Sequence, residues 1–326
     1  MAKVGNLMAT SEQVKSLIKA FSDNDKEKFK TVSLQIAAYE ALHGHEAVAR
    51  DIKRLIDAIG QHNSVLKINT QNQMLESFLP TDRLNALVVS QEVKEKLERI
   101  INEYRNRNKL AKFGLCNRRR ILLEGKPGTG KTFTASVIAG ELGLPLYVIQ
   151  MDKIITKFMG ETSVKLRQIF DDIKNSQGVF LFDEFDALGA DRNFDNEVGE
   201  ARRILNSFLQ FVEQDFPNSI VVAATNNQKL LDQALFRRFD DVLHYALPDE
   251  EQIRKIFDLK LCDYSDSFLY TEKLIEAAKG LCHAEIINAC NDAIKESILN
   301  DKALTETSVM MHLGERTNIY GNVKEA

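Results

Sequence analysis

The chain has 326 residues, a length that allows two or three packed units, each with its own core. With 43 Lys and Arg residues against 47 Asp and Glu residues, the formal net charge is -4, which argues against a protein that binds mainly by neutralising nucleic-acid phosphates. The four cysteines form no CxxC pair, the N-terminus carries no apolar run typical of a signal peptide, and no apolar run is long enough to span a bilayer. We therefore expect a cytoplasmic protein with reduced thiols and no membrane segment.

The N-terminal part of the chain shows three segments in which apolar residues recur every three or four positions. These segments cover residues 14–21, 29–36 and 48–59, and such spacing is typical of amphipathic helices. We predict that they form a helical bundle in residues 1–60. Residues 61–84 are rich in Gln, Asn and Ser, a composition that predicts a linker.

A different pattern begins at Ser90, which is a suitable N-cap for an amphipathic helix over residues 93–104. Four short runs of consecutive apolar residues follow, at 121–123, 146–149, 179–182 and 220–224. Continuous apolarity suits strands that are buried on both faces. We therefore predict an α/β fold for residues 85–247, with a parallel sheet covered by helices on both faces. Helical spacing returns in residues 248–326 and predicts a C-terminal helical lid with a tail.

The first of these predicted strands leads into a glycine-rich loop. Residues 125–132, Gly-Lys-Pro-Gly-Thr-Gly-Lys-Thr, fit the pattern GxxxxGK[ST], and a segment compatible with a helix follows. Glycines let successive backbone N–H groups point at phosphate oxygens, Lys131 can reach the β and γ phosphates, and Thr132 can offer its hydroxyl to Mg²⁺. A flexible glycine turn is the alternative, and the predicted strand and helix on either side argue against it. The residues expected to contact ATP are Gly125, Lys126, Pro127, Gly128, Thr129, Gly130, Lys131 and Thr132.

Carboxylates and a short polar side chain follow two further predicted strands. Asp183 and Glu184 come directly after the run 179–182, and Asn226 follows the run 220–224. In open parallel sheets, ligands bind at the carboxyl ends of the strands. We expect Asp183 to help bind ATP and Mg²⁺, Glu184 to orient or deprotonate the attacking water, and Asn226 to hold this water or the γ phosphate. The alternative for the two carboxylates is a solvated strand end without a catalytic role.

Across about residues 85–300 the chain resembles the AAA family of ATPases. Besides the two phosphate-site motifs, the stretches Ala223-Ala-Thr-Asn-Asn227 and Leu231-Asp-Gln-Ala-Leu-Phe-Arg-Arg-Phe-Asp240 are similar to the family's second region of homology. The resemblance implies that Asn226 is the sensor residue, that Arg237 or Arg238 reaches the ATP of a neighbouring subunit, and that the subunits form a hexameric ring. The Pro-Gly that usually separates these arginines is missing, so the sequence does not decide which one is the finger. Local pairing of both arginines with Asp240 and Asp241 is the alternative.

Two further segments extend the resemblance. Gly280-Leu-Cys-His-Ala-Glu-Ile286 resembles the lid motif GxSGxDI with His283 in place of its glycine, and this histidine either contacts the nucleotide or faces solvent. Phe158-Met159-Gly160 lies where the family places the loop that lines the pore of the ring. An aromatic ring there suits a loop that grips an extended polypeptide, whereas packing of Phe158 in the core is the alternative.

These observations favour an ATP-hydrolysing homo-oligomer, a hexamer by family resemblance, that remodels or unfolds other proteins. One alternative is a nucleotide-gated partner of a protease or nuclease, for example in a defence system. Another alternative is a module that acts on nucleic acid. A basic cluster before the first predicted strand is the reason to consider it. This cluster consists of Arg105, Arg107, Lys109, Arg118, Arg119 and Arg120. The sequence contains no helix-turn-helix and no series of stacking aromatic residues, so we expect no nucleic-acid partner.

Overall fold

The computed structural model describes residues 15–16, 26–42, 45, 48, 50, 74–154, 159–186, 197–214, 216–226, 236–261 and 270–321. The chain divides into two compact units, Met1–Val65 and Leu66–Ala326. In the first unit, helix α2 (Lys26–Leu42) buries Val32, Ile36 and Ala37, which are spaced to lie on one face. The other two helices that we predicted for this unit fall almost entirely outside the described residues.

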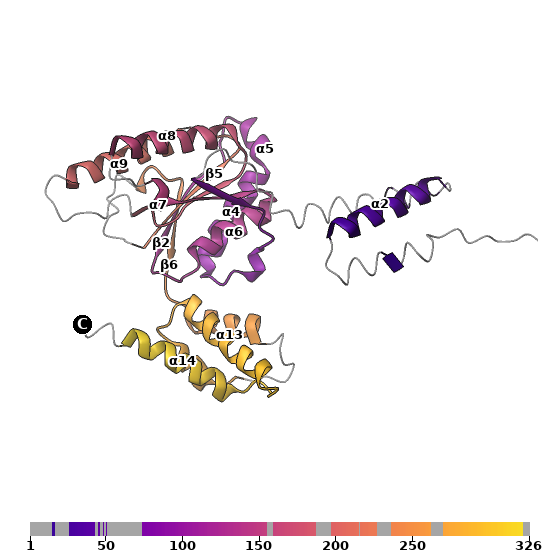
Figure 1. Cartoon of the computed structure of the whole chain (residues 1–326). Helices are drawn as coiled ribbons and strands as arrows, with labels where there is room; N and C mark the ends of the chain where they lie inside the picture. The colour runs from indigo at the N-terminus through magenta and orange to yellow at the C-terminus, as the bar shows by residue number, and fades with distance from the viewer. Residues whose placement is uncertain are drawn as a thin grey trace, which may run out of the picture. The chain divides into compact units, whose positions relative to one another are not determined.

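The second unit is built on a six-stranded sheet with the strand order β1-β3-β4-β5-β2-β6 (Figure 1). The strands are β1 (Leu75–Phe78), β2 (Arg120–Gly125), β3 (Leu146–Ile149), β4 (Val179–Phe182), β5 (Ile220–Thr225) and β6 (Asp241–Tyr245). Neighbouring strands are parallel except β1 and β3, which are antiparallel. The predicted α/β fold with a mostly parallel sheet is therefore confirmed.

The four apolar runs form the inner strands β3, β4, β5 and β2. Every residue of β4 and β5 is buried, because helices cover the sheet on both faces. The sequence analysis did not identify the edge strands β1 and β6, in which buried residues alternate with polar, more exposed ones such as Glu76 and His244. Strand β1 also lies inside the range 61–84 that its composition assigned to a linker, and it pairs with β3 from Leu75 opposite Ile149.

The helices of this unit pack on the two faces of the sheet. Those before the lid are η1 (Leu84–Ala86), α4 (Gln91–Arg105), α5 (Arg107–Ala111), α6 (Lys131–Leu142), α7 (Met151–Ile154), α8 (Met159–Asn175) and α9 (Glu197–Val212). Helices α4 and α6 cover one face, where Leu97 and Ile138 pack with Leu123 of β2. The hydroxyl of Ser90 accepts a hydrogen bond from the Val93 N–H at 3.4 Å, which confirms Ser90 as the cap of α4.

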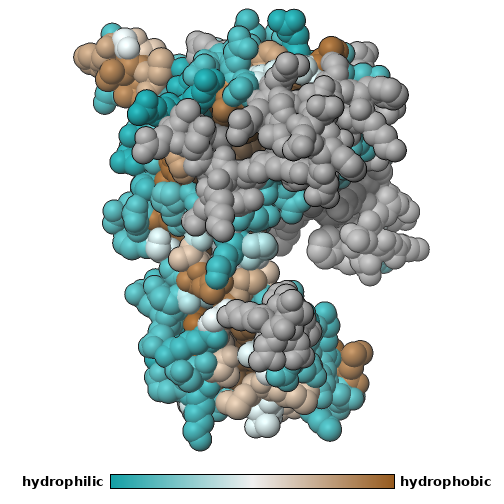
Figure 2. Space-filling view, turned by 90° about the vertical axis from the view of Figure 1, so that its left-hand side faces the viewer, coloured by the Kyte–Doolittle hydropathy of each residue, from teal (hydrophilic) through white to brown (hydrophobic). Residues whose placement is uncertain are grey.

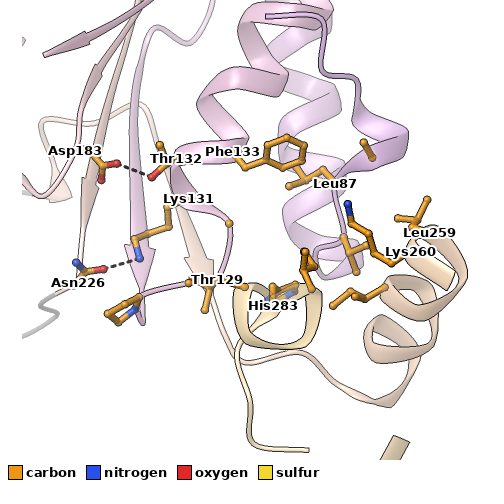
Figure 3. A pocket seen from close by; sticks show the side chains of 18 of the residues that line it. Leu87, Thr129, Lys131, Thr132, Phe133, Asp183, Asn226, Leu259, Lys260 and His283 are labelled. Atoms are coloured by element: carbon orange, nitrogen blue, oxygen red, sulfur yellow. Dashed lines mark hydrogen bonds between the residues drawn. The ribbon is translucent and has the colours of Figure 1, made fainter. Parts of the chain in front are cut away.

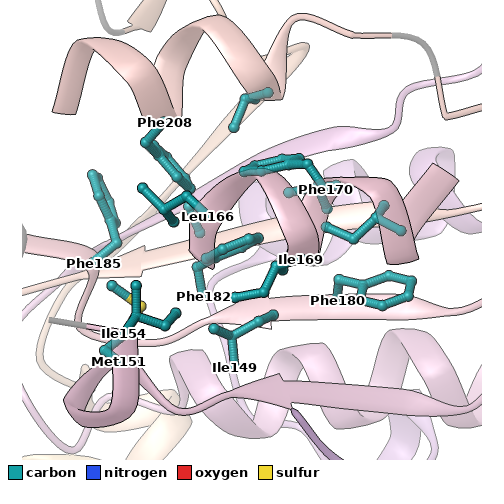
Figure 4. Close-up of a cluster of buried hydrophobic side chains, with 14 of the residues drawn as sticks. Ile149, Met151, Ile154, Leu166, Ile169, Phe170, Phe180, Phe182, Phe185 and Phe208 are labelled. Atoms are coloured by element: carbon teal, nitrogen blue, oxygen red, sulfur yellow. The ribbon is translucent and has the colours of Figure 1, made fainter. Parts of the chain in front are cut away.

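The opposite face carries an aromatic cluster between the sheet and helices α8 and α9 (Figure 4). Phe170 of α8 stacks on Phe182 of β4 with ring centroids 5.4 Å apart, and Phe208 of α9 meets Phe182 edge to face at 5.0 Å. Phe185 stacks on Phe208 at 5.7 Å and is 2% exposed. Because Phe185 directly follows Asp183 and Glu184, this packing anchors the turn that carries both carboxylates.

The C-terminal part of the second unit is a helical lid with a hydrophobic core of its own. Its helices are α11 (Glu250–Leu261), α12 (Glu272–Ala278), α13 (His283–Leu299) and α14 (Glu306–Gly321). In the space-filling view the lid is a separate lobe, with hydrophobic residues visible where it joins the sheet region (Figure 2). The predicted C-terminal helical region is thus confirmed. Among the helices that the structure describes, none is long and apolar enough to cross a membrane.

Candidate functional site

The glycine-rich loop lies between the carboxyl end of β2 and the start of α6, as predicted. Gly128 and Gly130 have φ angles of 73° and 99°, which residues with a Cβ rarely adopt. At Gly125 a Cβ would lie 2.3 Å from the carbonyl oxygen of Tyr245 on β6. The glycines therefore allow both the curled backbone and the close approach of β6.

The side chain of Lys131 is buried inside this loop. Its ammonium Nζ donates hydrogen bonds to the carbonyl oxygens of Gly125 and Lys126 and to Oδ1 of Asn226, each at 2.8 Å. Burial lowers the pKa of Lys131, and the charges of neighbouring carboxylates, Asp183 first among them, oppose this shift. Lys131 is thus a positioned cation at the carboxyl ends of β2 and β5.

Thr132 and Asp183 meet next to this lysine. The Thr132 hydroxyl donates a hydrogen bond to Oδ2 of Asp183 at 2.5 Å (Figure 3), while Oδ1 of Asp183 accepts one from the Glu184 N–H at 3.0 Å. Glu184 has a φ of 51°, an uncommon left-handed conformation for a residue with a Cβ, and its side chain is exposed. The structure therefore brings together the lysine, hydroxyl, carboxylates and amide that the sequence placed on separate segments.

These residues line one part of a cavity of 490 Å³ between the sheet region and the lid. Figure 3 shows Lys131, Thr132, Asp183 and Asn226 at one end, and Leu87, Leu259, Lys260 and His283 toward the other. The remaining side chains that line the second end are mostly apolar, and they come from the segment around η1 and from α11 and α13: Ala86, Val88, Ile256, Ala284 and Ile287. No motif in the sequence marked these apolar residues, because only the fold brings the three segments together.

The lid contacts the glycine-rich loop directly. The Ala284 N–H donates a hydrogen bond to the carbonyl oxygen of Gly128 at 3.0 Å, and a Cβ on Gly128 would lie 2.4 Å from Sγ of Cys282. Between these two lid residues, His283 begins α13 and is 7% exposed. The expectation that His283 faces solvent is therefore wrong, because the ring is enclosed at the junction of lid and sheet region.

The two candidate arginine fingers lie just before β6 and have different surroundings. The side chain of Arg238 forms an ion pair with Glu213 at 3.3 Å, whereas Arg237 is exposed and makes no ion pair with a described residue. Local pairing with Asp240 and Asp241, the alternative raised by the sequence, is not what the structure shows. Those carboxylates pair with basic residues from other segments, namely Arg120 for Asp240, and Arg99 and Arg118 for Asp241.

The basic cluster before β2 also makes contacts within the chain. Arg105 pairs with Glu141 at 2.9 Å, Arg118 with Glu103, and Arg107 lies over the ring of Tyr104 at 4.5 Å from its centroid. Charges that are neutralised in this way contribute less to binding a phosphate backbone. The predicted pore residue Phe158 lies outside the described residues, whereas Met159 is the first residue of α8.

A mostly parallel sheet with a phosphate-type loop at the carboxyl end of β2, a buried lysine and adjacent carboxylates defines the class of P-loop nucleoside triphosphatases. Residues 121–247 match the family model for the "ATPase family associated with various cellular activities (AAA)". Over 301 residues the chain is 32% identical to "Uncharacterized AAA family ATPase y4kL" of Sinorhizobium fredii, and the alignment covers 90% of each chain. The chain belongs to the AAA family of ATPases.

Two further relatives are larger proteins, and the similarity covers only part of each. The chain is 32% identical over 234 residues to the "ATP-dependent zinc metalloprotease FtsH" of Parabacteroides distasonis, which is 69% of this chain and 34% of that protein. It is 29% identical over 199 residues to a "Putative 26S proteasome regulatory subunit homolog" of Methanocaldococcus jannaschii, which is 60% of this chain and 53% of that protein. The chain thus spans about a third of the FtsH relative and about half of the proteasomal one.

Proposed function

We propose that this AAA ATPase is a ring-forming protein remodeller or unfoldase that works in the cytoplasm. The observation that carries the proposal is the similarity of the chain to an "ATP-dependent zinc metalloprotease" and to a "26S proteasome regulatory subunit homolog", whose names both refer to proteolysis. The ion pairs within the basic cluster favour a protein substrate over nucleic acid. We further propose that residues 1–60 form a separate helical bundle, joined by residues 61–84 to the module in 85–247 and the lid in 248–326. The compact unit Met1–Val65 supports this division.

We assign one role in ATP binding or hydrolysis to each residue at the polar end of the cavity. Lys131 binds the β and γ phosphates, since its ammonium is already directed to the centre of the loop. Glu184 deprotonates or orients the attacking water, because its exposed carboxylate directly precedes the buried Phe185, which anchors the turn. Asn226, which accepts a hydrogen bond from Lys131, acts as the sensor that holds this water or the γ phosphate.

The oxygens of Thr132 and Asp183 fit a magnesium ion. They are hard oxygen donors that lie next to each other at the entrance of the phosphate loop, and such donors are what Mg²⁺ prefers. When bound, Mg²⁺ would neutralise phosphate charge. The remaining residues of the loop, from Gly125 to Gly130, enclose the phosphates with their backbone N–H groups, except Pro127, which has none.

We propose that Arg237 is the arginine finger and that Arg238 positions it. Arg237 is exposed and has no ion pair among the described residues, so its guanidinium is available to the ATP site of a neighbouring subunit. The ion pair with Glu213 holds Arg238 within its own subunit. A finger supplied by a neighbour requires an oligomer, which supports the homo-hexameric ring.

The remodelling role predicts an aromatic pore loop at Phe158 and at Met159, the first residue of α8. Phe158→Ala should leave basal ATPase activity and thermal stability nearly unchanged and abolish the stimulation of ATPase activity by casein, an unfolded protein. Phe113→Ala is the matched control, since Phe113 is 75% exposed and lies outside the site. The measurements are ATPase rates with and without casein, DNA or RNA, together with thermal melting.

Two outcomes of this experiment would contradict the proposal. A Phe158→Ala variant that melts at a much lower temperature and still responds to casein would show a core residue, for which truncation costs about 3–5 kcal/mol. Stimulation of the unmodified protein by nucleic acid and not by casein would favour the nucleic-acid alternative. Copurification of the Glu184→Gln variant with a protease or nuclease, without any effect of casein, would favour the nucleotide-gated partner.

A further inference from the structure

Asp186 is a carboxylate beside the site to which the proposed mechanism gives no role. It comes directly after the buried Phe185, whose ring packs in the aromatic cluster and holds this turn at the carboxyl end of β4 (Figure 4). Burial lowers the pKa of Lys131, and the charge of Asp186 opposes this shift second only to that of Asp183. Asp186 therefore lies close enough to the phosphate loop for its charge to act on the lysine there.

The carboxylate of Asp186 has no partner in the part of its own subunit that the structure describes. Its Oδ1 atom is buried and accepts no hydrogen bond, and the side chain forms no ion pair with a described residue. Lys131 has no proton left for it, because all three N–H groups of the ammonium bond to other oxygens. A partly buried carboxylate without a donor is poorly solvated, so a cation from outside the subunit would stabilise it.

The other two carboxylates of this turn have less need of such a cation. Asp183 already accepts hydrogen bonds from the Thr132 hydroxyl and the Glu184 N–H. Glu184 is exposed to water, and its proposed role requires a carboxylate that is free to act on the attacking water. Asp186 is thus the acceptor in this turn that is left for a basic side chain.

Arg237 is an exposed cation without an ion pair among the described residues, but it lies far from Asp186 of its own subunit. The next residue, Arg238, pairs with Glu213, which lines a cavity together with the residues that begin β2. Arg237 is therefore at the amino ends of the parallel strands, whereas Asp186 lies beyond their carboxyl ends. Strands β5 and β2 also separate β6 from β4, which adds about 14 Å at the usual strand spacing. An arginine side chain is too short to span both separations.

We propose that Asp186 pairs with Arg237 of a neighbouring subunit, so that the ion pair joins two copies of the chain at the ATP site. This inference rests on the proposed role of Arg237 as the finger. A guanidinium has five N–H donors, so it can bond to the carboxylate and still present N–H groups to the phosphates. Asp186 is thus a positioning residue, which holds the finger and does not contact the reacting atoms.

The test is the assembly of the protein with ATP, measured by sedimentation velocity in the Glu184→Gln background, in which ATP should stay bound. Asp186→Arg should weaken assembly by about tenfold or more, because it places two like charges against each other. When Arg237→Asp is also present, the same change should instead strengthen assembly by about tenfold, because it restores a pair of opposite charges. Asp171→Arg, at an exposed position of α8, is the matched control and should have a small effect with either residue at 237.

A neutral pair of variants tests the same contact without placing an arginine in a partly buried position. Asp186→Asn should weaken assembly when Arg237 is present and have no effect when Arg237→Gln is present as well. Thermal melting shows that each variant is folded.

Two results would overturn the ion pair and leave the ring and its finger standing. One is an effect of Asp186→Arg that has the same sign with Arg237 and with Arg237→Asp. The other is an equal effect of Asp186→Asn with Arg237 and with Arg237→Gln. Failure of the Glu184→Gln protein to assemble with ATP would overturn the ring itself and, with it, the ion pair.

Discussion

At the scale of single residues, the site separates the binding of ATP from its hydrolysis. Lys131 is buried and is held by three oxygen acceptors, whereas Glu184 is exposed on a turn whose next residue is locked in the aromatic cluster. In the proposed roles, the lysine contacts the phosphates in both the ground state and the transition state. The glutamate is proposed to act on the attacking water only, so replacing the two residues should have different effects on ATP binding and on turnover.

Lys131→Ala should abolish ATP binding, because it removes the loop cation that we propose binds the β and γ phosphates. Glu184→Gln should bind ATP with nearly unchanged affinity and lose about 10²–10⁴-fold in turnover, the usual contribution of a general base. Nucleotide titration and steady-state ATPase assays of both variants test the pair. Equal affinities with equal turnover in the two variants would contradict these roles.

At the scale of secondary-structure elements, the loop before α6 and the start of α13 act as one unit. The contact of Gly128 with Cys282 and the hydrogen bond from Ala284 close the lid onto the phosphate loop. Displacing this contact should therefore weaken nucleotide binding.

Gly128→Ala should lower ATP affinity by about tenfold or more, since its Cβ would press on Cys282, and a shift of 1.4 kcal/mol already corresponds to tenfold. Gly143→Ala is the matched control, because Gly143 also has a positive φ, of 64°, but has open space around the added Cβ. Both variants should lose about 1–2 kcal/mol of folding free energy through left-handed strain. Calorimetric titration and urea unfolding measure the two effects, and equal ATP affinities in the two variants would refute a coupling of lid and loop.

A second link between elements joins the starts of β2 and β6 through Asp240. Its carboxylate accepts hydrogen bonds from the N–H groups of Arg119 and Arg120 and from the Arg120 side chain. Burial by itself would raise the pKa of Asp240, but these hydrogen bonds and the Arg120 charge outweigh it, so the pKa lies below its ordinary value of 3.8. A carboxylate whose pKa is lowered by folding stabilises the protein at pH values above the pKa that it has in the unfolded chain. This stabilisation is lost as the pH falls through the pKa that it has in the folded protein.

Asp240→Asn should therefore destabilise the protein by about 1–3 kcal/mol at pH 7, the range for hydrogen bonds to charged groups. The difference from the unmodified protein should shrink as the pH falls below about 4. Urea unfolding as a function of pH measures this, with Asp152→Asn on the exposed side of α7 as a control that should show no such difference. A destabilisation that stays constant down to pH 3 would mean that the charge of Asp240 is not responsible.

At the scale of the whole molecule, the ATPase cycle should depend on contacts between subunits. The described chain holds Lys131 and Lys260 at the cavity, while the exposed Arg237 has no ion pair in its own subunit among the described residues. The arginine side chain thus has the freedom to complete the site of a neighbour.

Arg237→Ala should retain ATP binding and lose about 10³–10⁵-fold in turnover, as fingers do in related phosphoryl-transfer sites. Arg238→Ala and Glu213→Gln should lower turnover less than Arg237→Ala does. Their two losses should be similar in size, because each variant breaks the same ion pair. Mixing Arg237→Ala subunits with Glu184→Gln subunits should restore part of the activity if the finger acts in trans. No recovery of activity in mixtures shown to contain mixed oligomers would argue against an intersubunit site. A larger loss of turnover in Arg238→Ala than in Arg237→Ala would make Arg238 the finger instead.

The sequence by itself determined the features that short stretches of chain encode. The glycine loop at 125–132 has to curl because its glycines permit positive φ, and the fully apolar runs of β4 and β5 have to be buried on both faces. The helix that begins after Ser90 follows in the same way from its cap and its spacing. The carboxyl ends of parallel strands then bring Asp183 and Asn226 to one edge of the sheet.

Only the tertiary structure decided the features that depend on residues far apart in the chain. Strands β1 and β6 carry mixed patterns because one side of an edge strand lacks a neighbour, so their place follows from pairing with β3 and β2. The ion pairs of Arg238 and Asp240 and the apolar end of the cavity each join segments that are far apart in the chain, and the burial of His283 depends on the same packing. Packing and ion pairing depend on distance in space, and no local pattern of residue types encodes that distance.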